Sequence, residues 1–156
     1  MTPIRVGMGF DAHRFTDTPP IKLGGIVVDF ARGVEATSDG DVAAHALADA
    51  LLGAAGLGDL GEHFPSTDPR WRGADSMVIL EDVLRLVQAA GWQVVNADLT
   101  IVAQDLVISP HRRAISASLS DLLAVDVSVK ATTTDGMGFI GRAEGLAALA
   151  VAAITI

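Results

Sequence analysis

Residues 38–53 read SDGDVAAHALADALLG, a polar opening followed by a run of Ala and Leu. Ser38, with Asp41 three residues later, resembles a capping box in which Asp stands in place of Glu. Good helix formers dominate the residues that follow, as far as about Ala55. We therefore predict a helix that opens within residues 38–41 and ends near Ala55.

On the N-terminal side of this helix the sequence favours extended structure. Residues 4–10 predict a first strand, and residues 21–30 predict a hairpin-like stretch broken by Gly24-Gly25. On the C-terminal side, residues 56–69 are predicted as loop. The helix is therefore expected to follow the first strands directly.

Helices and strands alternate over the rest of the chain. Residues 75–90 carry apolar residues at helical spacing, and Gly91 follows as a stop signal. Ser109-Pro110 predicts the start of another helix, which runs to about residue 123. Strands are predicted at residues 92–102 and 125–133. This order indicates one domain over residues 1–156, an α/β (α+β) sandwich with helices on one face of a mixed sheet.

The C-terminal residues 145–156 can be interpreted in two ways. Their Ala and Leu content favours a helix. Their length and the Ile-Thr-Ile ending suit a buried strand equally well.

The composition limits the classes of function. The 156 residues are 50% hydrophobic but only 4% aromatic, so the core must be built from aliphatic side chains and alanine. A small domain this apolar is expected to bury part of its surface against copies of itself. The net charge of −8 argues against a nucleic-acid partner. It leaves a phosphorylated substrate open, because a bound cation can supply positive charge locally.

The sequence also restricts the chemistry of any metal site and the location of the protein. There is no cysteine, so a metal must be held by His and carboxylate side chains. Residues 1–10 lack the pattern of a signal peptide, and the longest apolar run, residues 146–156, is too short to span a membrane. We expect a cytoplasmic protein with no membrane partner.

Asp11, His13 and His45 are the candidate metal ligands. Residues two apart on a strand point the same way, so Asp11 and His13 project together at the end of the first strand. His45 lies in the first turns of the predicted helix. One carboxylate and two imidazoles suit zinc, and three protein ligands leave a fourth position open, as in a catalytic site. The alternatives are a surface pair at a strand end and a histidine held only by packing.

Two glycine patterns resemble dinucleotide-binding motifs. Gly7, Gly9 and Ala12 fit one pattern, and Gly56, Gly58 and Gly61 fit another. Neither pattern runs into a helix, because Pro19-Pro20 follows the first and Pro65 follows the second. We do not expect a dinucleotide site.

Residues 130–136, KATTTDG, place three hydroxyls and a carboxylate at a strand end. Such groups can bind phosphate oxygens and a hard cation. The alternative is a polar turn after a strand. Phe139 and Arg142 follow, and Arg142 could capture an anion or face solvent.

The order of these motifs resembles one known family. The chain carries Asp11-x-His13, then SDGDVAAHALADALLG at 38–53, then GDLGEHFPSTDP at 58–69, then KATTT at 130–134. Together they closely resemble the 2-C-methyl-D-erythritol 2,4-cyclodiphosphate synthase family, over essentially the whole chain. The SDGDVAxHAL and KATTT blocks are the most specific.

The resemblance implies an assembly as well as an activity. Members of the family are homotrimers, in which the sheets of three subunits pack around a central axis and the active sites lie at subunit boundaries. The family has a strand at residues 145–156, so we predict a strand there. The implied reaction cyclises 4-diphosphocytidyl-2-C-methyl-D-erythritol 2-phosphate in the non-mevalonate isoprenoid pathway. Its 2-phosphate attacks the β-phosphorus, and CMP leaves.

The resemblance also implies the site residues. Asp11, His13 and His45 would hold one Zn²⁺ per chain, and Asp135 would hold Mg²⁺ or Mn²⁺ with the substrate diphosphate. Thr133 matches a residue that helps the transition state. Substrate-binding positions, besides Asp11, His13 and Thr37, are Ser38, Asp59, Leu60, Gly61, Phe64, Pro65, Ser66, Thr67 and Asp68 for the methylerythritol part and the loop after it. The nucleotide positions are Ala103, Val107, Ile108, Ser109, Thr132, Thr133, Thr134 and Asp135. Phe139 and Arg142 match a central-cavity site that can take an isoprenoid diphosphate.

The chain departs from the family pattern at three places. Thr37 stands where the family usually has a His near the reacting phosphates, so catalysis is expected to be weaker. Asp135 replaces Glu, and Leu106-Val107 replaces Pro-Lys in the cytosine-binding loop. These departures leave open a catalytically impaired trimer that binds nucleotide or isoprenoid phosphates. A generic zinc phosphohydrolase is a further alternative, although the second metal cluster of two-metal enzymes is missing from the sequence.

Overall fold

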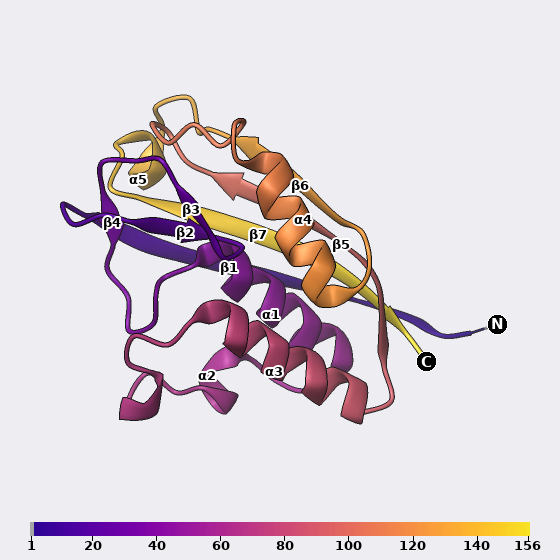
Figure 1. Ribbon diagram of the computed structural model, residues 1–156. Helices are drawn as coiled ribbons and strands as arrows, with labels where there is room; N and C mark the ends of the chain where they lie inside the picture. Colours follow the sequence, from indigo (N-terminus) through magenta and orange to yellow (C-terminus); the bar gives the residue numbers. More distant parts are fainter. Residues whose placement is uncertain (1) are drawn as a thin grey trace.

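A mixed five-stranded sheet forms the centre of the molecule. The computed structural model describes residues 2–156 and orders the strands β4-β1-β7-β5-β6. Strands β5 and β6 are parallel, and the other neighbours are antiparallel. Figure 1 shows the two long strands β1 and β7 side by side, with the chain termini at the same end. The strands of this sheet are β1 (Ile4–Thr16), β4 (Gly33–Val34), β5 (Gln93–Val102), β6 (Val127–Thr132) and β7 (Gly145–Thr155).

The long helices lie on one side of this sheet (Figure 1). α1 (Val42–Ala55) packs on β1 and β7, and α4 (Arg112–Leu123) packs on β6. α3 (Ser76–Ala89) packs against α1. The predicted α/β sandwich with helices on one face of a mixed sheet is therefore confirmed. The shorter elements are the hairpin β2 (Ile21–Leu23) and β3 (Ile26–Val28), with α2 (Leu60–His63), η1 (Pro69–Trp71) and α5 (Gly138–Gly141).

Two glycines bring α1 very close to β1. A Cβ atom at Gly7 would lie 2.0 Å from the carbonyl oxygen of Ala50, and one at Gly9 would lie 1.8 Å from that of Ala46. Both separations are far inside van der Waals contact, so neither position accepts a side chain. The first glycine pattern of the sequence therefore serves helix–strand packing.

Asp41 caps α1 and ties it to the β2–β3 turn. Its side chain is fully buried and accepts hydrogen bonds from the backbone N–H groups of Ala44, Gly24 and Gly25. α1 begins at Val42, so the helix opens within residues 38–41 as predicted, but its N-cap is Asp41 and the predicted Ser38 capping box is wrong. Asp41 is the N-cap in place of Ser38 because the two oxygens of its carboxylate can accept hydrogen bonds from three N–H groups.

The helix boundaries differ from the sequence predictions at two other places. α4 begins at Arg112 without a side-chain cap, so Ser109-Pro110 precedes it in a turn and does not cap it. The predicted loop at residues 56–69 contains the single-turn helix α2, which Asp59 caps. Gly91 ends α3 as predicted, with a left-handed φ of 87°.

The predicted strands are confirmed, and the first of them is longer than predicted. β7 confirms the strand interpretation of the C-terminal segment, and the β2–β3 hairpin confirms the turn at Gly24-Gly25. β1 continues six residues beyond the predicted end, to Thr16. Asp11 and His13 therefore lie inside this strand.

The second face of the sheet carries exposed apolar side chains along β1 and β7. On β1 these are Ile4, Val6, Met8 and Phe10, which are 53–68% exposed, and on β7 they are Leu149 and Val151. They alternate with the glycines that face α1, as expected for a strand with period two. Within residues 2–156, the structure has no helix of the length and apolarity needed to cross a membrane.

Candidate active site

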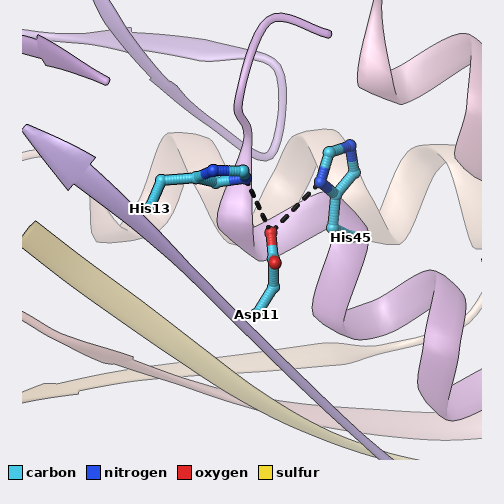
Figure 2. A group of neighbouring side chains, drawn as sticks. All are labelled: Asp11, His13 and His45. Atoms are coloured by element: carbon cyan, nitrogen blue, oxygen red, sulfur yellow. Dashed lines mark hydrogen bonds and ion pairs between the residues drawn. The ribbon is translucent and has the colours of Figure 1, made fainter. Parts of the chain in front are cut away.

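Three side chains from one strand and one helix converge at the surface of the molecule. The Oδ2 atom of Asp11 lies 3.0 Å from Nε2 of His13 and 3.1 Å from Nδ1 of His45 (Figure 2). One ligand atom from each residue lies within 4.8 Å of the others. The close approach of α1 to β1 at the two glycines brings His45 over the strand. The structure thus brings together the three residues that the sequence proposed as ligands.

The backbone fixes how His13 faces this cluster. Its Nδ1 lies 3.0 Å from the carbonyl oxygen of Glu35, which can only accept a hydrogen bond. Nδ1 therefore carries the proton. In the neutral ring Nε2 then presents a lone pair to Asp11, and this buried nitrogen has no hydrogen-bond partner despite the short distance. A lone pair facing a carboxylate requires a positive charge between them.

His45, like His13, has one ring nitrogen facing Asp11 and the other facing a hydrogen-bond partner outside the cluster. Its Nε2 lies 2.8 Å from the hydroxyl of Ser76 and 3.3 Å from that of Ser38, on the side away from Asp11. A proton on Nε2 is donated to these hydroxyls, which leaves Nδ1 free to act as a ligand. Metal-bound histidines commonly donate their second ring N–H in this way. The donor set therefore fits a borderline divalent cation.

The charges of the cluster depend on burial and on mutual contact. Burial would raise the pKa of Asp11, but the two adjacent imidazoles outweigh this effect and lower it to about 2. Burial would lower the pKa of His13, but contact with Asp11 outweighs it and raises the pKa above its usual value. Without a cation, the raised pKa lets His13 keep a proton to a higher pH than an ordinary histidine does.

A cavity of about 250 Å³ opens beside the cluster. Ser38 and Thr37, from the segment before α1, lie in its wall together with the three candidate ligands. The lining is completed by Asp49, Leu60, Phe64, Ser66, Trp71 and Ile79. This is enough room to admit part of a small phosphorylated molecule beside the ligands.

One known protein family matches almost the whole chain. The model of the YgbB family matches residues 4–155. The chain belongs to the YgbB family. Its relatives include the 2-C-methyl-D-erythritol 2,4-cyclodiphosphate synthase of Pseudomonas putida (strain W619), which is 54% identical over 152 residues, 96% of this chain and 97% of the relative. This confirms the family resemblance on which the sequence interpretation rests.

Two solved structures extend the comparison to three dimensions. A CDP-bound 2C-methyl-D-erythritol-2,4-cyclodiphosphate synthase superposes with a TM-score of 0.87 at 40% identity, covering 95% of this chain and 98% of that one. The bifunctional IspDF from Campylobacter jejuni gives a TM-score of 0.95 at 39% identity, covering 99% of this chain and 43% of that longer one. Neither comparison favours the alternative of an impaired binding protein.

In this YgbB-family chain, several predicted substrate residues lie near the cavity but outside its wall. Gly61 belongs to α2, and Asp59 is the N-cap of that helix, where it accepts a hydrogen bond from Glu62 N at 3.1 Å. Pro65, Thr67 and Asp68 follow in the loop, where Asp68 pairs with Arg70 at 2.6 Å.

The two segments predicted to bind the nucleotide meet each other at one edge of the sheet. β5 and β6 are parallel, so their carboxyl ends lie together, with Val102 opposite Thr132. Ala103 N donates to Thr132 O at 3.1 Å, and Gly136 N donates to Gln104 Oε1 at 3.1 Å. Neither segment lines the metal cavity of the same chain.

Phe139 and Arg142, which were predicted for the central-cavity site, do not line the metal cavity. Phe139 lines a second cavity of about 240 Å³, together with Ala12, His13, Arg14, Glu144 and Gly145. Arg142 pairs with Glu144 at 2.9 Å. The anion-capture role of Arg142 therefore competes with an existing carboxylate partner.

Sequence reasoning missed Asp49, Trp71 and Ile79 as cavity residues. Burial raises the pKa of Asp49, and the carboxylates of Asp59 and Asp11 add to this effect, although the N–H of Leu60 opposes it. Asp49 could have been found, because it lies four residues after His45 and therefore on the same helix face. Trp71 belongs to η1, in a region without periodic pattern.

Proposed function

We propose that this chain is a cyclodiphosphate synthase. It converts 4-diphosphocytidyl-2-C-methyl-D-erythritol 2-phosphate to 2-C-methyl-D-erythritol 2,4-cyclodiphosphate and releases CMP. The observation that carries the proposal is the convergence of Asp11, His13 and His45 beside a cavity, in a chain closely similar to synthases of that name. The reaction is a metal-dependent phosphorus–oxygen lyase step without a protein nucleophile.

Zn²⁺ is the proposed ion, one per chain, held by Asp11, His13 and His45. The two imidazole nitrogens with one carboxylate, and the absence of cysteine, favour zinc over harder cations. Bound zinc supplies the positive charge that lets two anionic phosphates approach each other. Three protein ligands leave a position for a substrate phosphate oxygen.

The cavity residues hold the substrate in position for ring closure. Ser38, with Asp59, Leu60 and Gly61, binds the methylerythritol hydroxyls, and residues 64–68 close over it. Thr37 presents a hydroxyl in the cavity wall toward the reacting phosphates. Holding both ends of one molecule in line lowers the barrier by bringing the reacting groups together in the right geometry.

The nucleotide part binds at the joined ends of β5 and β6, contributed by a neighbouring subunit. Residues 103–109 accommodate the base, and Thr132, Thr133 and Thr134 offer hydroxyls to the diphosphate. Thr133 stabilises the transition state. Asp135 holds Mg²⁺ or Mn²⁺ together with the diphosphate, because one zinc with one carboxylate leaves only about one net positive charge. The separation of this segment from the metal cavity within one chain supports a site built from two subunits.

The proposed assembly is a homotrimer whose subunits pack through the exposed apolar face of β1 and β7. A sheet face with Val6, Met8 and Phe10 uncovered requires a partner, since an apolar area of this kind is costly in water. Phe139 and Arg142 are proposed to take an isoprenoid diphosphate in the central cavity. A cytoplasmic location stays a prediction of the sequence.

A turnover assay tests the proposal directly. The purified chain is incubated with Zn²⁺, Mg²⁺ and the cytidyl substrate, and ³¹P NMR follows the products. We expect equimolar cyclic diphosphate and CMP. Inorganic phosphate as the product would indicate a phosphohydrolase, and binding of the substrate without turnover would indicate an impaired binding protein.

A further inference from the structure

Ser76, the first residue of α3, reaches into the neighbourhood of the metal cluster from an element that supplies no ligand. Its side chain is fully buried, and its hydroxyl lies 2.8 Å from Nε2 of His45. Helix capping does not explain this position, because Asp75 is the N-cap of α3 and accepts from Met77 N. The hydroxyl of Ser76 is therefore available for a task outside its own helix.

A carboxylate determines which way this hydroxyl points. Ser76 Oγ makes a short hydrogen bond with Oδ1 of Asp39, and Ser76 N donates to Oδ2 at 3.2 Å. Asp41 N also donates to Oδ1, at 3.3 Å, and the Lys22 ammonium lies 3.7 Å from Oδ2. Both oxygens of Asp39 face donors, so each acts as an acceptor.

The hydroxyl has a single proton, and this decides the state of His45. Because that proton goes to Asp39, the oxygen of Ser76 can only accept from the imidazole. His45 therefore carries a ring proton on Nε2. Its Nδ1 faces the Asp11 carboxylate at 3.1 Å, so a cation held between these two atoms meets the Nδ1 lone pair. The second nearby hydroxyl, that of Ser38, is farther away at 3.3 Å and also accepts from Gly40 N.

We propose that Ser76, held by Asp39, is the positioning residue that fixes the tautomer and ring orientation of His45 for metal binding. Nothing in the role of Ser76 requires contact with substrate. The inference deepens the proposed function, since it rests on His45 being a zinc ligand. It accounts for Asp39 in the SDGDV stretch and for the fully buried serine of α3.

Zinc affinity is the first test. Ser76→Ala is expected to raise the dissociation constant for Zn²⁺, measured by chelator competition, about 10–100-fold, the usual effect of removing an outer partner of a histidine ligand. Ser116→Ala is the matched control, because Ser116 also donates from a helix to a carbonyl oxygen, that of Val127 at 2.6 Å, far along the chain from the cluster. The control should bind zinc as the wild type does.

The tautomer of His45 is the second test, and it does not depend on metal. In metal-free protein, ¹H–¹⁵N spectra of the wild type should show a proton on Nε2 of His45, with the downfield proton shift of a hydrogen bond. Ser76→Ala should lose that shift. Asp39→Ala removes the acceptor of the Ser76 hydroxyl proton and should deplete the Nε2–H form even where Ser76→Ala folds poorly.

The outcomes separate this inference from the proposed function. If the wild type binds no zinc, the proposed metal site is wrong, while the spectra still test Ser76. If the wild type binds zinc and Ser76→Ala leaves both the zinc affinity and the Nε2–H shift unchanged, the positioning role is overturned. A wild-type ring that carries no proton on Nε2 overturns it as well.

Discussion

Oδ2 of Asp11 lies 3.1 Å from Nδ1 of His45, so a carboxylate inside a strand meets an imidazole 34 residues later on a helix. This contact joins the two elements that frame the cavity. The neighbouring His13 completes the cluster from the strand side.

His45→Ala should abolish tight zinc binding, because it removes the ligand that α1 contributes. Metal analysis of the dialysed wild type should give about one zinc per chain, and the variant should give close to none. His111→Ala is the matched control, since His111 contacts Asp29 N at 3.3 Å at a distant surface and should leave zinc content unchanged. Full zinc retention in His45→Ala would remove His45 from the ligand set.

Zinc affinity should fall as the pH is lowered. Contact with Asp11 outweighs burial and raises the pKa of His13, so the metal-free chain still holds this proton somewhat above pH 6.5. Zinc needs the neutral ring and must displace the proton. Asp11, with a pKa of about 2, stays ionised throughout. Below the pKa of His13, the apparent dissociation constant should rise about tenfold per pH unit.

Chelator competition between pH 5.5 and 8.5, with a chelator of known proton affinity, measures this dependence. Proton release on zinc addition, followed with a dilute pH indicator, provides an independent readout. A dissociation constant that stays flat across the whole range would show that His13 is not a ligand.

Asp135→Asn should reduce turnover and keep both the fold and the zinc. Asp135 is exposed at the end of β6, where its backbone N–H donates to the Thr133 hydroxyl at 3.2 Å, and its carboxylate is the candidate ligand for the diphosphate-bound cation. The variant should need a higher Mg²⁺ concentration for half-maximal rate. Asp126→Asn, at an exposed position before the other end of β6, is the control. An unchanged rate with an unchanged Mg²⁺ dependence would leave Asp135 with only its turn-forming role.

Met8→Glu should break the trimer. Met8 is 68% exposed in the middle of the apolar face of β1, where a buried carboxylate at a subunit interface would be unpaired. Light scattering at micromolar concentration should give the mass of three chains for the wild type and of one chain for the variant. Val78→Glu, at a 53% exposed position on α3, should remain trimeric. A monomeric wild type would refute the assembly.

Asp41→Ala should lower the free energy of unfolding by about 3–5 kcal/mol, because each buried N–H left without an acceptor costs about 1–3 kcal/mol. Three such groups depend on this side chain. Urea unfolding at fixed subunit concentration measures the change. Asp121→Ala, at an exposed position of α4, should change stability by less than about 0.5 kcal/mol. A loss of equal size in both variants would contradict the capping role of Asp41.

Much of this architecture follows from local patterns in the sequence. Helical spacing and the Gly91 stop predicted α3, and residues 4–10, 92–102 and 125–133 were predicted as strands. The ligands Asp11 and His13 followed from strand geometry, since residues two apart share a face. The joint order of short motifs identified the family, which in turn resolved the C-terminal segment as a strand.

Other features depend on contacts between distant segments and leave no local signal. The cap of α1 was misplaced because Ser38 and Asp41 are both good capping residues, and the choice depends on whether the β2–β3 turn supplies further donors. Ser76 and Glu35 support the histidines from segments 31 and 22 residues away in sequence. No periodicity predicts such partners. β1 extends beyond its predicted end because its pairing with β7 continues through polar residues.

The glycines of β1 give the cluster a constraint that no ligand residue carries. At Gly7 and Gly9 only a hydrogen atom separates the strand from the backbone of α1. Even alanine at either position would lift the helix, and His45 would move away from Asp11 and His13. The distance between His45 and the two strand residues is therefore set two to four residues before Asp11, by positions outside the cluster. Any descendant of this chain that keeps the metal has almost no freedom to vary there, although both residues are chemically silent.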